Sequence, residues 1–151
     1  MAKVLKALYF KKTDFLNAKL GHKPFFIWRS ILWGRQVLHQ GLRWRIGSGE
    51  QVKIYNCNWI PRPSTFKIVS APTLPLEAIV FLLINDEHNW NEALIKQQFM
   101  SEDVDCNLKM MLPRTLRPNQ SIWAYDKHGN YSVKSGYQVA LRLKFPYCPG
   151  S

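Results

Sequence analysis

The segment 41–62, GLRWRIGSGEQVKIYNCNWIPR, carries the clearest fold signal in the chain. Residues 42–46 alternate apolar and basic side chains with the period of a β-strand, and residues 51–55 alternate again after the turn formers at 47–50. This pattern predicts an antiparallel hairpin with one apolar and one cationic face. The cationic face would carry Arg43, Arg45 and, across the ladder, Lys53.

Helical periodicity flanks this segment on both sides. Apolar residues repeat every 3.6 positions from Phe26 to Leu38, and Gly41 follows as a C-cap. Further along, 90–99 carries a helical stripe, and 101–111 opens with the acidic first turn that favours a helix N-terminus. Ser135 is expected to cap the last helix.

A second hairpin and a proline-rich stretch complete the pattern. Residues 122–125 and 131–134 alternate around a turn, and four of the nine prolines lie within 61–75. That stretch indicates a linker or an extended covering segment. We therefore predict an α+β fold of short helices and two antiparallel β-hairpins, in two small lobes joined by the Pro-rich segment. The predicted parts are a basic helix-plus-hairpin lobe at 1–62, a linker at 63–76 and a helical pair plus hairpin at 77–151.

Positive charge is concentrated in the first 67 residues. They hold thirteen Lys and Arg against Asp14 and Glu50, whereas residues 68–151 balance eight cations with eight acids. Cations interleaved with tryptophan are typical of surfaces that contact phosphates and bases, so we predict nonspecific binding to an RNA or DNA backbone. The candidate binding residues are Arg29, Arg35, Arg43, Arg45 and Lys53.

A structural interpretation of the same residues stays open. Arg29 and Arg35 would then be solvated helix residues whose stems cover apolar neighbours, while Trp28 and Trp44 belong to the core. The sequence favours the core position for both tryptophans.

The sequence lacks the residue patterns that catalysis and metal binding require. The acids fall in the runs 86–87 and 102–105, which are typical of a solvated surface, and two-metal catalysis needs carboxylates that converge. Cys57, Cys106 and Cys148 form no close pair with one another or with a histidine, as a zinc site would require. We predict no catalytic site, no metal, no cofactor and no enzyme activity of the chain alone.

The cysteines also bear on the compartment. Three isolated cysteines without a secretory leader indicate a reduced intracellular location, the nucleus or the cytoplasm. The longest apolar run, 78–84, is too short to span a bilayer, so no membrane partner is expected. Residues 1–20 are rich in Lys and poor in acid like an organelle transit peptide, but they lack Arg and Ser, and an organellar location is the alternative.

Two blocks of the sequence resemble a known family. FFIWRSILWGR at 25–35, GLRWRIGSG at 41–49 and WIP at 59–61 resemble the segment downstream of the polymerase in plant LINE-type (non-LTR) retrotransposon reverse transcriptases. IWAYDKHGNYSVKSGY at 122–137 resembles the beginning of the zinc-binding domain of the same family. The resemblance covers nearly the whole chain.

This resemblance implies a noncatalytic fragment of a reverse transcriptase. The polymerase with its paired aspartates would lie upstream, the Cys/His cluster downstream, and 77–151 would end in the truncated start of the zinc-binding-type domain. Partners besides nucleic acid would be the polymerase and zinc-binding segments of a parent polyprotein. Two alternatives are a structural connector packed on the missing polymerase and a decayed relic without a selected function. Tyr55 and Cys57, where the family commonly has Trp and Asp, favour the relic.

Overall fold

The computed structural model describes residues 26–62 and 65–144, with side chains from residue 33 onward. These residues belong to two compact units. Unit 1 combines the chain up to Gly41 with the chain from Ser132, and unit 2 spans Leu42–Tyr131. The predicted signals at 1–20 and at Cys148 lie outside the described residues.

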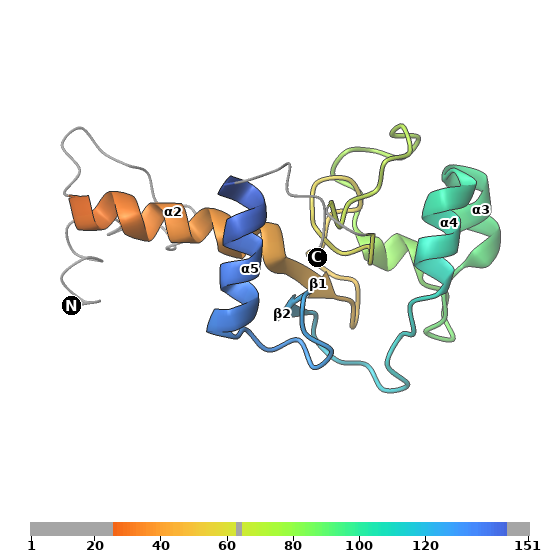
Figure 1. The fold of residues 1–151 in the computed structure, drawn as a ribbon. Coiled ribbons are helices and arrows are strands. Elements are labelled where there is room, and N and C mark those ends of the chain that lie inside the picture. Colours follow the sequence, from red (N-terminus) through yellow and green to blue (C-terminus); the bar gives the residue numbers. More distant parts are fainter. Residues whose placement is uncertain (1–25, 63–64, 145–151) are drawn as a thin grey trace. The chain divides into compact units, whose positions relative to one another are not determined.

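Unit 1 is built on a pair of helices, α2 (Phe26–Gly41) and α5 (Val133–Lys144), and α5 packs across α2 (Figure 1). The buried residues of α5 are small and share one face: Gly136, Val139 and Ala140. Ser132, rather than the predicted Ser135, caps α5, because the Ser135 N–H donates to Ser132 Oγ at 3.2 Å. The helix expected from Phe26 to Gly41 is confirmed.

Unit 2 contains a two-stranded antiparallel sheet of β1 (Leu42–Arg45) and β2 (Gln120–Trp123), with Leu42 opposite Trp123 and Arg45 opposite Gln120 (Figure 1). The predicted α+β class is confirmed. The first predicted hairpin is wrong, because the strand at 42–45 pairs with a segment more than seventy residues away.

The segment 51–55 finds other partners. Lys53 forms a bridge with Ile79, and the flanking backbone bonds join Ile54 N–H to the Ala78 carbonyl at 2.9 Å and Val80 N–H to the Val52 carbonyl at 2.8 Å. On β1, the Trp44 N–H donates to the Asn58 carbonyl at 2.6 Å. The backbone groups that a hairpin would have used are therefore satisfied elsewhere.

The second predicted hairpin is also wrong. After β2 the chain forms a tight turn, in which the Asp126 carboxylate accepts the N–H groups of His128 at 2.9 Å and Asn130 at 3.0 Å. The Trp123 N–H donates to the Gly129 carbonyl at 2.8 Å, and the ladder ends there. Residues from Val133 onward are helical instead of extended.

Three short helices contribute to the core of unit 2. They are the 3-10 helix η2 (Val80–Leu83), α3 (Glu92–Gln98) and α4 (Ser101–Leu108), and α3 packs on α4. Asn91 caps α3 by accepting the Leu94 N–H at 3.1 Å. The largest fully buried side chains are those of Ile54, Trp59, Ile60, Leu83, Ile95 and Trp123.

The described part of the Pro-rich stretch, 65–75, lies within unit 2. The Trp59 N–H donates to the Phe66 carbonyl at 2.7 Å, and the Tyr55 hydroxyl accepts the N–H groups of Thr73 at 3.2 Å and Leu74 at 3.1 Å. This packing fits an extended covering segment, the second of the two interpretations. The units accordingly divide after Gly41 and after Tyr131 rather than at residues 62 and 76.

Gly47→Ala is expected to lower the free energy of unfolding by about 2 kcal/mol. A Cβ at Gly47 would lie against the backbone of Arg117 and Pro118, closer than real Cβ atoms approach, and backbone cannot move as a flexible side chain can. Gly34→Ala is the matched control, since nothing lies within 4 Å of its Cβ in α2 and alanine favours a helix by about 0.5–1 kcal/mol. Urea unfolding of both variants tests this, and equal stability of the two would contradict it.

Candidate nucleic-acid interface

Strand β1 places two arginines on one face of the sheet. Arg43 and Arg45 are two residues apart, and side chains at that spacing point to the same side of a strand. Both line a pocket of about 270 Å³, which we call the basic pocket. Lys109, just after α4, also lines it. The fold therefore adds a cation from the electrically neutral part of the sequence to the two arginines of β1.

The electrostatics of the basic pocket favour an anion. Burial lowers the pKa of Arg43, and the charge of Arg45 lowers it further, although an arginine stays protonated at neutral pH. Among the described residues that line the pocket none is acidic. Within 33–62 and 65–144 the ion pairs do not include Arg43, Arg45 or Lys109. An incoming phosphate would relieve the repulsion between these like charges.

The rest of the basic pocket is apolar. Trp90, Met110 and Leu112 line it together with Ile46 and Pro61. The Trp90 indole N–H donates to the Met110 carbonyl at 2.8 Å, and its ring lies 6.1 Å from the ring of Trp59 in the core. These contacts hold the Trp90 ring in place before any ligand binds.

The other predicted binding residues lie elsewhere. Lys53 forms an ion pair with Glu77 at 2.6 Å, which raises the pKa of Lys53 through the hydrogen bond and the charge of that carboxylate. Its charge is thus compensated, and the expected position across a ladder from β1 is wrong. Arg35 lies on α2 in unit 1, and the side chain of Arg29 lies outside the described residues.

Unit 1 has a basic character of its own. Neither α2 nor α5 contains an Asp or Glu, and α5 adds three cations that sequence reasoning missed: Lys134, Arg142 and Lys144. On α5, Lys134, Tyr137, Leu141 and Lys144 follow one another at the spacing of a single helical face, and all four are exposed. The sequence signal for this basic helix is the absence of Asp and Glu from residues 133–144, which leaves the three positive charges unbalanced.

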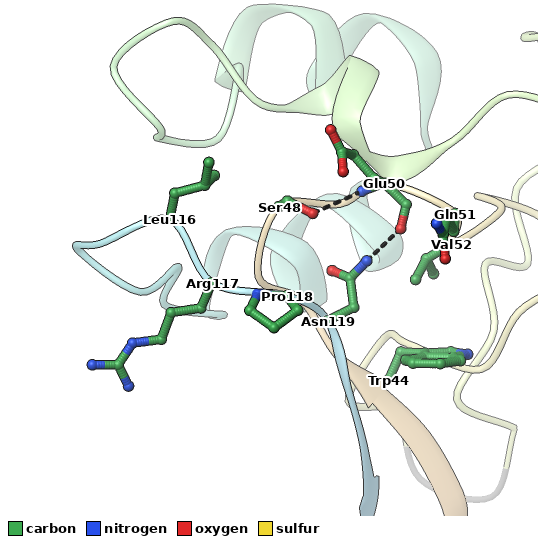
Figure 2. A pocket seen from close by; sticks show the side chains of 9 residues that line it. All are labelled: Trp44, Ser48, Glu50, Gln51, Val52, Leu116, Arg117, Pro118 and Asn119. Atoms are coloured by element: carbon green, nitrogen blue, oxygen red, sulfur yellow. Dashed lines mark hydrogen bonds between the residues drawn. The ribbon is translucent and has the colours of Figure 1, made fainter.

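A second, larger pocket of about 510 Å³ lies beside the turn after β1 (Figure 2). Trp44 lines it and is 37% exposed, so the predicted core position of this tryptophan is wrong. Asn119 stabilises this turn, because its Oδ1 accepts the N–H groups of Gly47 at 2.9 Å and Gly49 at 3.0 Å. Figure 2 shows the Arg117 side chain pointing away from the other lining groups. With Glu50 in its wall, this pocket is less suited to an anion than the basic pocket.

The acidic residues also differ from expectation at one point. The expectation that Asp103 belongs to a solvated run is wrong, because Asp103 is fully buried and forms an ion pair with Arg62. It accepts hydrogen bonds from Ser70 Oγ at 2.6 Å, Ser70 N at 2.8 Å and Val69 N at 3.0 Å. Burial acts to raise the pKa of Asp103, but these donors and Arg62 outweigh it and hold the pKa below its ordinary value.

Within the described ranges, no three His, Cys, Asp or Glu side chains gather where they could hold a metal ion. Cys57 and Cys106 are both half-buried and unbonded to each other. Over the same part of the chain, no helix combines the length and apolarity needed to cross a bilayer.

Comparison with known proteins gives a partial likeness. No protein-family model matches the chain, and no solved structure matches it. The chain is similar to an uncharacterized mitochondrial protein of Arabidopsis thaliana, 33% identical over 60 residues, which make up 40% of this chain. The matched region is 39% of that protein, so the chain spans well under half of the relative's length.

Proposed function

We propose that the chain is a noncatalytic fragment derived from a retrotransposon reverse transcriptase, and that it binds RNA or DNA nonspecifically through its cations. The observation that carries the binding proposal is the basic pocket, where Arg43, Arg45 and Lys109 converge without an acid among the described lining residues. Each such cation that neutralises a phosphate releases condensed counterions, which gives affinity without reading sequence. The mitochondrial description of the Arabidopsis relative supports an organellar location for this proposal.

The test is binding of a labelled nucleic acid across a salt series. We expect Arg43→Glu with Arg45→Glu to weaken binding at least about tenfold at physiological salt and to make the salt dependence shallower by about two phosphate contacts. Lys67→Glu with Lys127→Glu is the matched control, because it changes the net charge equally at exposed positions outside both pockets. Affinity that is independent of salt, or an equal loss in the control, would overturn the proposal.

A structural connector is the second candidate. Two large apolar side chains in the segment between α4 and β2 support it, since Met111 is 94% exposed and Leu116 is 75% exposed. Exposed apolar side chains of this kind are available for contact with another protein segment. A monodisperse, soluble chain with a cooperative thermal transition would count against the connector.

A further inference from the structure

The apolar wall of the basic pocket exceeds what a phosphate alone requires. A phosphate is satisfied by charge and by N–H donors, which Arg43, Arg45 and Lys109 supply. The side chains of Met110 and Leu112 offer neither, and the Trp90 indole N–H is already bonded to the Met110 carbonyl, so water finds few hydrogen-bond partners at this part of the lining. A lining that combines three cations with an aromatic ring and two methionines suits a ligand with an anionic and a flat apolar part.

The size of the pocket agrees with a ligand larger than an ion. Its volume of about 270 Å³ is several times the roughly 30 Å³ that one water takes in the liquid. Met111, one of the lining residues, is almost fully exposed, so this part of the lining is open to solvent. The Trp90 ring is fixed by its hydrogen bond to the Met110 carbonyl, so little freedom remains to be lost on binding.

We infer that the basic pocket accepts one unstacked nucleobase while its cations contact the adjoining phosphates, so that the chain prefers single-stranded to double-stranded nucleic acid. The inference rests on the proposed function and names the form of its ligand. In a duplex the bases are paired and stacked, and taking one out costs a few kcal/mol. A single strand presents its bases freely, and stacking or packing of one base on protein side chains contributes about 1–3 kcal/mol.

The experiment compares three probes of equal length by fluorescence anisotropy: oligothymidine, an abasic oligodeoxynucleotide with the same phosphates, and a duplex. We expect oligothymidine to bind the full chain at least about fivefold tighter than the abasic strand, which is the lower end of the stacking contribution. An oligouridine arm shows whether RNA gives the same ratio. Equal affinity for oligothymidine and the abasic strand would overturn the inference and leave electrostatic binding intact. Failure of every probe to bind would overturn both proposals.

Variants assign the effect to the pocket. Leu112→Ala and Met111→Ser are expected to reduce the ratio of oligothymidine to abasic affinity, whereas Lys109→Gln should weaken both probes by the same factor. Met100→Ser is the matched control, because this methionine is also exposed but does not line the pocket. Met111 makes so little buried contact that its variant keeps the fold, which a thermal melt verifies. A ratio that both pocket variants leave unchanged would overturn the assignment to this site.

Discussion

Asp103→Ala is expected to lower the free energy of unfolding by about 3 kcal/mol or more. The carboxylate has no exposed surface, and it accepts hydrogen bonds from Ser70 and from the Val69 N–H while pairing with Arg62. Its removal leaves buried donors unsatisfied, and each such group costs about 1–3 kcal/mol. Glu102 keeps one contact with Arg62, which limits the loss on that side.

The matched control for this variant is Asp105→Ala. Asp105 lies on the same helix, α4, but it is exposed, and surface substitutions away from special contacts change stability by less than about 0.5 kcal/mol. Urea denaturation of the wild-type chain and the two variants gives the comparison. Similar losses for Asp103→Ala and Asp105→Ala would show that the buried network does not stabilise unit 2.

The same carboxylate gives a pH dependence with a definite sign. Because the pKa of Asp103 is lowered in the folded state, its contribution to stability is present above about pH 4, the ordinary range of an unfolded aspartate. That contribution is lost as the pH falls through the folded pKa. The stability difference between wild type and Asp103→Ala should therefore shrink as the solution is acidified below that range.

The local sequence pattern was sufficient to predict those elements that depend only on nearby residues. The helix at 26–41 follows from apolar periodicity and a terminal glycine, and the common face of Arg43 and Arg45 follows from strand alternation. The local pattern could not predict which strand pairs with β1. The pattern at 51–55 is also typical of a strand, but its backbone bonds to residues 78–80, so it is not available to pair with β1.

In the candidate site, too, some residues are predictable from the local pattern and others depend on tertiary contacts. Its two arginines are predictable from strand alternation, but Lys109 lies far from them in the sequence, and only the tertiary fold of unit 2 brings it to the same pocket. Asp103 likewise looks like an ordinary first-turn acid, and nothing local indicates that Arg62 and Ser70 will surround it. Tertiary contacts decide both positions.

Tyr55 illustrates how a departure from the pattern of a family that the sequence only resembles can carry a structural role. Its hydroxyl accepts the N–H groups of Thr73 and Leu74, and its ring lies 6.4 Å from that of Phe99. An indole could donate but could not accept these two bonds. The tyrosine therefore helps to fix the covering segment at 65–75, and its presence alone is weak support for a decayed copy.

Trp59→Ala is expected to lower the free energy of unfolding by about 4 kcal/mol. Trp59 is fully buried in the core of unit 2. Its indole N–H donates to the Ile54 carbonyl at 2.9 Å, its backbone N–H donates to the Phe66 carbonyl, and its ring lies against Trp90. The substitution removes a large apolar volume, leaves the Ile54 carbonyl unpaired and takes away the support of a basic-pocket wall.

Two further variants separate these contributions. Trp59→Phe keeps most of the apolar ring but not the indole donor, so its loss should be about 1–3 kcal/mol, the cost of an unsatisfied buried acceptor. Trp44→Ala is the control within the same unit, because Trp44 is partly exposed and should cost less than Trp59→Ala. Since the Trp59 ring packs against Trp90, Trp59→Ala should also reduce the preference for oligothymidine over the abasic strand, whereas Trp59→Phe, which keeps a ring there, should largely retain it. A Trp59→Phe variant as stable as wild type would show that the bond to Ile54 adds nothing measurable.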